Sequence, residues 1–334
     1  MSLPVLERVE RPRRRRRGRR LLVVALAALV AVAVAVVLRY GPHSLRVHPF
    51  RHSAKPAQPS ASPPPPAPAP RPPAKPPAPL LVGPALLSHR FRPGLSAKAA
   101  ILVDATTGRV LWARNPHERR QIASTTKIMT ALLALHKLPP HAIVRVARQV
   151  PRVPLVKEGL RAGERVQAWK LFYGLLLYSG NDDALALAIA AAGSRPAFVH
   201  EMNAEAKRLG LHDSHFAGPS GVVDVDNYSS AWDLAALTRV ALRNQRFARI
   251  VRTRVRRVAW APPTYSKIYV NKNLLLTRYP GATGVKTGWT TKAGHCLVAS
   301  ARRGKLSLIA VVLKSSDEYG DARRLLNLGF STVG

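Results

Sequence analysis

Residues 122–130 read Ile-Ala-Ser-Thr-Thr-Lys-Ile-Met-Thr and place Ser124 three residues before Lys127. The apolar pattern of residues 125–137, closed by two prolines, predicts a helix that begins next to this serine. Side chains three residues apart lie on the same side of a helix, so the amine would lie beside the hydroxyl. A serine is a weak nucleophile until a base takes its proton, and a desolvated lysine with a lowered pKa can be that base. The stretch therefore predicts a nucleophile at a helix N-terminus, where backbone N–H groups favour an oxyanion.

Two further short motifs follow in order along the chain, Ser179-Gly180-Asn181 and Lys286-Thr287-Gly288. Each motif alone is common in proteins of this size. The first lies between two segments of helical composition, residues 168–177 and 184–192, and is expected to form a connecting turn that includes Asp182. The three motifs together carry the hydroxyl, amine and amide groups of an acyl-transfer site.

The segment from residue 85 to residue 334 has the patterning of one catalytic domain. Alternation and β-branched composition predict strands at residues 99–104, 110–113, 296–301 and 306–313. Amphipathic patterns predict helices at residues 125–137, 168–177, 184–192, 196–209, 231–244 and 319–330. Strands at both ends around a helical middle indicate an α+β fold in which one sheet is split by a helical insertion.

The N-terminal quarter differs in composition from this domain. Residues 1–20 form a basic tail that ends in an arginine run, and residues 21–38 are an uninterrupted run of Leu, Val and Ala. That run is just long enough to span the hydrocarbon core. The arginines predict a cytoplasmic tail and an extracytoplasmic domain. A cleavable signal peptide is the alternative, although its apolar region is usually shorter. Residues 39–84 are rich in Pro and Ala and indicate an extended linker.

The net charge of +36 is shared by both parts of the chain. Residues 1–98 hold 18 Lys and Arg against 2 acids, and residues 99–334 hold 35 against 15. A basic domain favours anionic surroundings such as acidic lipid or wall polymers. The arginine run adjoins the apolar run, so we interpret it as a topology signal and expect no specific nucleic acid partner. Cys296 lies in an apolar run and is expected to be buried and inert. The pair His212 and His215 lacks further ligands, and nucleotide-binding motifs are absent, so no metal or cofactor is expected.

The three motifs, in this order, resemble those of the serine D-alanyl-D-alanine carboxypeptidases, the low-molecular-mass penicillin-binding proteins. Further similar blocks lie at residues 198–211, 228–234, 271–275 and 284–300, so the resemblance covers about residues 90–330. It implies a penicillin-binding-protein/β-lactamase-like transpeptidase fold, an antiparallel sheet flanked by helices with a helical subdomain.

The resemblance also implies a catalytic role for three residues. Ser124 would be the nucleophile and Lys127 its base. Ser179 would relay a proton to the departing D-alanine nitrogen.

The remaining motif residues would bind the substrate. Asn181 would hydrogen-bond the substrate peptide, and Lys286 and Thr287, on an edge strand facing the nucleophile, would hold its terminal carboxylate. Gly288 would let the acyl-peptide backbone approach closely. The backbone N–H groups of Trp289 and of the nucleophile would form the oxyanion hole.

The implied function is a membrane-anchored carboxypeptidase that removes the terminal D-Ala of peptidoglycan stem peptides through an acyl-enzyme, which β-lactams would also form. A D,D-endopeptidase of peptidoglycan cross-links, or a non-catalytic protein that binds the cell wall or polyanions, remains an alternative. A β-lactamase is disfavoured, because the glutamates available for deacylation, Glu201 and Glu205, fall in an ordinary amphipathic helix. Asp183 and Trp289 depart from the residues common at their positions, which bears on substrate preference.

Overall fold

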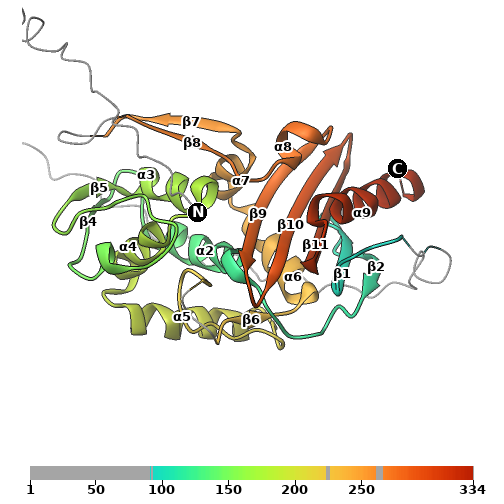
Figure 1. Cartoon of the computed structure of the whole chain (residues 1–334), viewed down its shortest axis with the longest axis horizontal. Coiled ribbons are helices and arrows are strands. Elements are labelled where there is room, and N and C mark those ends of the chain that lie inside the picture. Colours follow the sequence, from blue (N-terminus) through green and yellow to red (C-terminus); the bar gives the residue numbers. More distant parts are fainter. Residues whose placement is uncertain (1–90, 92, 223–225, 261–265, 334) are drawn as a thin grey trace, which may run out of the picture. The chain divides into compact units, whose positions relative to one another are not determined.

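The computed structural model describes residue 91 and residues 93–222, 226–260 and 266–333 (Figure 1). The predicted tail, apolar run and linker, residues 1–20, 21–38 and 39–84, lie outside the described residues. Among the residues that are described, no helix combines the length and the hydrophobicity needed to cross a membrane.

A five-stranded antiparallel sheet forms the centre of the domain, with the strand order β2-β1-β11-β10-β9. The strands are β1 (Ala99–Asp104), β2 (Val110–Arg114), β9 (Ala282–Thr290), β10 (Gly294–Arg303) and β11 (Leu306–Ser315). The first strand of the sequence, β1, pairs with both β2 and the last strand, β11, so the helical middle of the chain is an insertion into one sheet. This confirms the predicted α+β architecture. The strand β9 is an edge of the sheet, as the resemblance implied.

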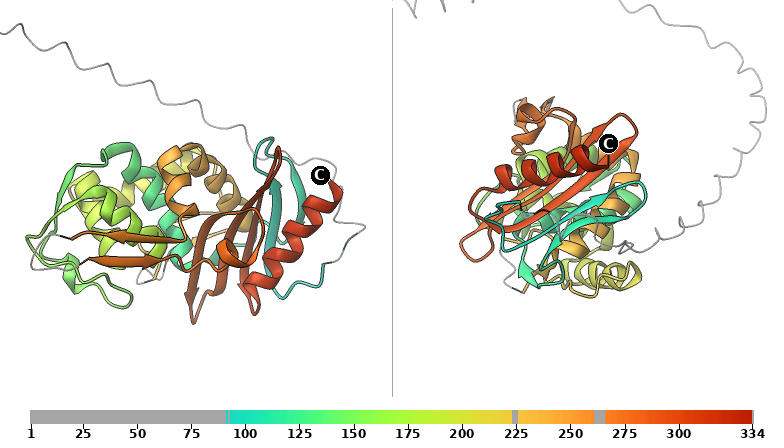
Figure 2. Two further views of the ribbon diagram at one scale, coloured as in Figure 1. Left: turned by 90° about the horizontal axis from the view of Figure 1, so that it is seen from above. Right: turned by 90° about the vertical axis from the view of Figure 1, so that its right-hand side faces the viewer.

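Helices cover both faces of this sheet (Figures 1 and 2). The C-terminal helix α9 (Glu318–Thr332) packs on β10 and β11, and α8 (Leu275–Arg278) contributes Leu275 to the same apolar core, whereas the other helices lie on the opposite face or beyond the edge strand. These are α2 (Lys127–Lys137), α3 (Ala168–Tyr173), α4 (Asn181–Ala192), α5 (Arg195–Arg208), α6 (Ala231–Arg243) and α7 (Gln245–Arg252). Short helical turns are η1 (Ala123–Thr126), η2 (Val150–Arg152) and η3 (Gly174–Tyr178).

Three two-stranded pairs complete the secondary structure. They are β3 (Arg120–Gln121) with β6 (Tyr228–Ser229), β4 (Ile143–Arg145) with β5 (Arg165–Gln167), and β7 (Val255–Val258) with β8 (Lys267–Val270).

The alternation of side chains in β1 explains why the sheet has helices on both faces. Ile101 and Val103 belong to the apolar core shared with α2 and α6, whereas Ala100 and Leu102 belong to the core shared with α9. All four side chains are fully buried. A strand that is apolar on both faces is stable only when both faces are covered.

Two predicted helices differ at their boundaries in a way that matters for the site. The helix expected at residues 125–137 begins as the 3₁₀ turn η1, and α2 itself starts at Lys127. The helix expected at residues 168–177 passes into a π-turn, η3, whose last turn ends at Ser179 in the left-handed region (φ 76°). The turn of the second motif is shorter than predicted, because Asn181 is already the first residue of α4.

Candidate active site

Lys127 is fully buried and its amine contacts three oxygen atoms. Nζ lies 2.9 Å from Ser124 Oγ, 2.8 Å from Asn181 Oδ1 and 2.9 Å from the backbone oxygen of Ser220. The Asn181 amide is fixed in this orientation because its Nδ2 donates to the oxygen of Pro154. Two of the three contacts are therefore to oxygens that can only accept a hydrogen bond. The amine and the Ser124 hydroxyl are therefore held within hydrogen-bond reach of each other, as a base for that hydroxyl must be.

Ser124 lies in the 3₁₀ turn η1, which faces the edge strand β9. A Cβ on Gly288 would lie 3.0 Å from the backbone nitrogen of Ser124 and 3.0 Å from the oxygen of Ile122. Any larger residue at this position would push the strand away from the turn. Gly288 therefore allows β9 to lie directly beside the backbone N–H of the serine, with Trp289 next along the strand.

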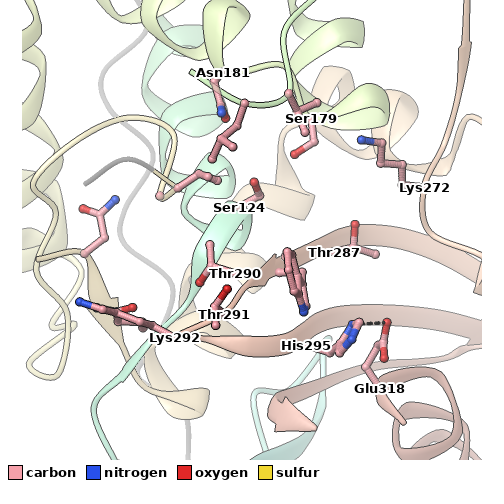
Figure 3. A pocket seen from close by; sticks show the side chains of 18 of the residues that line it. Ser124, Ser179, Asn181, Lys272, Thr287, Thr290, Thr291, Lys292, His295 and Glu318 are labelled. Atoms are coloured by element: carbon pink, nitrogen blue, oxygen red, sulfur yellow. Dashed lines mark ion pairs between the residues drawn. The ribbon is translucent and has the colours of Figure 1, made fainter. Parts of the chain in front are cut away.

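A cavity of about 630 Å³ opens over this serine (Figure 3). Figure 3 shows Ser124 with Ser179 and Asn181 toward the helical side and Thr287 on the opposite, strand side. Six of the eight predicted site residues line the cavity, namely Ser124, Ser179, Asn181, Thr287, Gly288 and Trp289. The two lysines, Lys127 and Lys286, lie behind its wall.

Lys286 does not occupy the position expected of a residue in direct contact with a ligand. Its side chain is 1% exposed, and Nζ donates to the oxygen of Thr287 at 2.9 Å. Burial, and next the positive charge of Lys272, lower the pKa of Lys286 to about 7. Lys272 itself lines the cavity beside Ser179 and is thus a second cation available to an anionic substrate group.

Buried carboxyl groups of Asp182 and Asp183 stabilise the second motif. Asp182 accepts hydrogen bonds from the backbone N–H groups of Glu158, Gly159 and Leu160 at 2.8–3.1 Å. These bonds fix the segment whose residue Val156 lines the cavity and accepts a hydrogen bond from Asn181 N.

Asp183, which departs from the small residue expected there, is fully buried under this turn. A Cβ on either Gly174 or Gly180 would overlap its carboxyl group. Burial, and then the neighbouring carboxyl of Glu158, raise the pKa of Asp183 well above its ordinary value. Glu158 in turn pairs with Lys267 at 3.0 Å. Burial thus favours the protonated form of Asp183. Its carboxyl group packs against Gly174 and Gly180 and so supports the turn at Ser179.

Several residues of the site were not identified from the sequence. The backbone oxygen of Ser220 has no sequence signal, because any residue carries one. Among the described residues, Glu318 is the acidic side chain that lines the cavity, and it pairs with His295 at 3.2 Å. These two residues come from α9 and β10 and meet only through the packing of that helix on the sheet.

Other predicted features lie away from the cavity. Glu201 pairs with Lys137, and Glu205 pairs with Arg208 at 2.6 Å, so both glutamates belong to surface ion pairs of α5. Cys296 is buried, as predicted, and burial raises the pKa of its thiol to about 11. No cluster of three or more His, Cys, Asp or Glu side chains suited to a metal ion occurs in the part of the chain that the structure describes.

A serine beside a buried lysine, on a helical insertion that faces an edge strand, defines the class of penicillin-recognising serine peptidases and β-lactamases. Comparison with known proteins identifies the family within this class. A family model described as D-alanyl-D-alanine carboxypeptidase (peptidase S11) matches residues 88–317. The chain belongs to this family.

Individual relatives agree with the family assignment. The D-alanyl-D-alanine carboxypeptidase DacF of Bacillus subtilis is 35% identical over 244 residues, which is 70% of this chain and 62% of that protein. The D-alanyl-D-alanine endopeptidase of Escherichia coli is 31% identical over 240 residues, 70% of this chain and 77% of the relative. The crystal structure of the Streptomyces K15 DD-transpeptidase superposes with a TM-score of 0.68 at 33% identity, covering 72% of this chain and 99% of that one. The matched segment thus spans less than two thirds of the Bacillus relative.

Proposed function

We propose that this domain is a serine D-alanyl-D-alanine carboxypeptidase that removes the terminal D-Ala of peptidoglycan stem peptides. One observation carries the proposal. The Lys127 amine is fully buried, lies 2.9 Å from the Ser124 hydroxyl, and is held there by hydrogen bonds to oxygens of Asn181 and Ser220. A lysine without a functional role normally keeps its amine in water, because burial of that charged group costs free energy.

The proposed reaction has two stages. In the first, Ser124 Oγ forms a bond to the carbonyl carbon of the penultimate D-Ala while Lys127 Nζ takes the hydroxyl proton. The backbone N–H groups of Ser124 and Trp289 stabilise the oxyanion. The C–N bond then breaks, and the leaving amine receives a proton through Ser179. In the second stage, water hydrolyses the ester and restores the serine. A β-lactam, whose ring amide resembles this dipeptide, would acylate the same oxygen.

The other motif residues position the substrate in this scheme. Asn181, already bonded to the lysine, would hydrogen-bond the peptide, and Gly288 would let its backbone lie along the edge strand. Thr287 lines the cavity and would hydrogen-bond the terminal carboxylate, and Lys286, buried directly behind it, would contribute the positive charge that attracts this carboxylate.

The carboxylate assignment predicts a dependence on both substrate charge and pH. The full-length protein should release D-alanine from a peptide that ends in D-Ala-D-Ala, and amidation of that end should lower kcat/KM roughly 10- to 150-fold, the range of one charge-assisted hydrogen bond. Because the pKa of Lys286 is about 7, the ammonium form prevails below pH 7. The preference for the carboxylate should therefore be largest below pH 7 and decline as the pH rises.

A double-mutant cycle tests the partner of the carboxylate. In Lys286→Met, which keeps the volume of the stem, the difference between the free and the amidated peptide should largely vanish. Lys272→Met is the matched control, since Lys272 lines the same cavity. If Lys272→Met and not Lys286→Met removes the difference, Lys272 is the carboxylate's partner. If no peptide of this kind yields D-alanine, the carboxypeptidase proposal fails.

A D,D-endopeptidase activity is the second candidate, because the Escherichia coli relative carries that name. Cross-linked dimers of stem peptides separate the two activities: a carboxypeptidase leaves the cross-link intact, whereas an endopeptidase converts the dimer to monomers. A non-catalytic wall-binding role is disfavoured by the Ser124–Lys127 geometry.

We also propose that residues 21–38 anchor the protein in the cell membrane, with the catalytic domain extracytoplasmic. The support is the uninterrupted apolar run after the arginine cluster. Protease added to intact spheroplasts should release a fragment that lacks about the first 40 residues, because the tail and the span together have about that length. Full protection of the catalytic domain would reverse the topology, and a mature N-terminus near residue 40 would indicate a cleaved signal peptide.

A further inference from the structure

A second cavity, of about 500 Å³, lies where α6 and α7 meet the sheet and the β1–β2 turn. Five arginines from three elements line it: Arg239, Arg243, Arg249, Arg252 and Arg302. None of its lining residues is acidic. We call this feature the arginine cavity. It is separate from the cavity over Ser124, with which it shares no lining residue.

Most of the positive charge of the arginine cavity is carried by exposed arginines. Arg243, Arg249, Arg252 and Arg302 are exposed, and in the described ranges none of them takes part in an ion pair with an acid. Concave sites lined by charges of one sign focus the electrostatic potential and attract counter-ions. The cavity therefore presents several guanidinium groups to a ligand from solution.

The floor of the arginine cavity is rigid. Arg239 is 5% exposed, and its guanidinium donates to the backbone oxygens of Ala105 and Thr106 at 2.9 Å each. The nearby acid, Asp104, already accepts hydrogen bonds from the backbone and hydroxyl of its own turn, at 2.8 Å from Thr106 N and from Thr107 Oγ1. Backbone contacts thus fix the buried arginine, and the charge of Asp104 also acts on it.

The donors of this cavity suit phosphate groups. A guanidinium presents a planar fork of N–H groups that bonds the oxygens of a phosphate, or of a carboxylate, in pairs. The wall also carries the hydroxyls of Thr283 and Ser300, which hydrogen-bond each other at 2.7 Å and leave one of their two O–H groups to donate to a further oxygen. Several forks around one cavity exceed what a single monovalent anion can satisfy. We propose that the arginine cavity binds a polymer of phosphodiester groups, with two or more phosphates in the cavity.

The arginine cavity lies close to the cavity over Ser124, so a polymer bound there would affect the proposed enzyme. Strand β9 runs from Thr283, in the arginine cavity, to Thr287, in the cavity over the serine. Four residues of strand span roughly 13 Å. A phosphate polymer in the surrounding wall would therefore hold the domain beside its peptide substrate and raise the effective concentration of that substrate.

Arginine modification, measured residue by residue, tests this binding on the full-length protein in detergent. An affinity measured for the whole protein would also include binding to the N-terminal arginines. Phenylglyoxal modifies accessible guanidinium groups, and mass spectrometry reports the rate at each arginine. Long-chain inorganic polyphosphate should slow the modification of Arg249 and Arg252 at least tenfold. Arg148 and Arg323, exposed arginines that do not line the cavity, should be slowed much less. Equal slowing at all four would show only diffuse attraction and overturn the proposal.

Two further probes distinguish a phosphate polymer from a carboxylate polymer and from a single phosphate group. Polyglutamate, a carboxylate polymer, and glycerol 1-phosphate, which has the single phosphate of a lipid headgroup, should each protect Arg249 and Arg252 far more weakly than polyphosphate at equal anionic charge. Equal protection by polyglutamate would overturn the preference for phosphate. Equal protection by glycerol 1-phosphate would overturn the requirement for several phosphates and indicate a headgroup.

A pair of matched variants tests the site itself. In Arg249→Gln/Arg252→Gln, half-protection of Arg243 should require roughly tenfold more polyphosphate, the size of one lost charge-assisted contact or more. Arg148→Gln/Arg323→Gln removes the same charge elsewhere and should leave the protection of Arg243 unchanged. Because the readout is protection and not D-alanine release, a failure here is distinct from a failure of the carboxypeptidase proposal. Equal effects of the two double variants would contradict a local site.

Discussion

Ser124→Ala is expected to abolish covalent labelling by a fluorescent penicillin and to stop D-alanine release from a D-Ala-D-Ala peptide. The proposed reaction passes through an ester on this oxygen, and alanine cannot form it. Loss of a catalytic serine costs on the order of 10⁶-fold in rate in another serine peptidase, so the residual rate should be close to background. The measurement is gel fluorescence together with mass-spectrometric mapping of the labelled peptide.

The matched control for this experiment is Ser331→Ala. Ser331 is an exposed serine near the end of α9 that does not line the cavity, and its loss should change neither labelling nor turnover. Labelling that survives Ser124→Ala would falsify the assignment of the nucleophile. Labelling that maps to another residue would identify a different one.

Lys127→Arg is expected to lower the acylation rate by roughly 10²- to 10⁴-fold, the usual contribution of a general base. The charge is retained, but a guanidinium does not give up its proton at ordinary pH. It is also larger and must fit among Ser124, Asn181 and Ser220, whose oxygens contact the amine at 2.8–2.9 Å. Stopped-flow acylation by penicillin separates this step from the later hydrolysis.

Lys137→Arg is the control for that substitution, because Lys137 is at the far end of the same helix and forms a surface ion pair with Glu201. It should acylate at the wild-type rate. Circular dichroism and thermal unfolding of Lys127→Arg show whether the change in rate comes from lost structure. A folded Lys127→Arg protein that acylates within a few-fold of wild type would remove Lys127 from the role of base.

Much of the fold was predictable because local sequence patterns were consistent with it. The strands β1 and β11 are apolar on both faces, and the helices α5, α6 and α9 were each predicted to within a few residues. The helix boundaries at the site were less predictable. The 3₁₀ turn at Ser124 and the π-turn before Ser179 arise where these segments pack on one another, and propensity alone favours regular helix there.

The placement of charged groups was the least predictable feature. Lys286 was expected to face the substrate, but its side chain is buried and its amine contacts a neighbouring backbone oxygen. Asp183 departs from the small residue common at its position, and burial and the carboxyl of Glu158 favour its neutral form. Desolvation and neighbours distant in sequence decide these properties, and neither can be read from residue spacing.

The sequence by itself determined the order of the three motifs, the position of Lys127 one helical turn after Ser124, and the family to which the chain belongs, because each depends on short-range spacing. Only the tertiary structure decided that the lysine amine lies between oxygens of Asn181 and Ser220, residues 54 and 93 positions away in the chain. The close approach of β9 to the serine, and the gathering of arginines from α6, α7 and β10 in one cavity, likewise depend on packing. Contacts between distant segments follow from how the buried faces of helices and sheet fit together, and a linear pattern does not specify that fit.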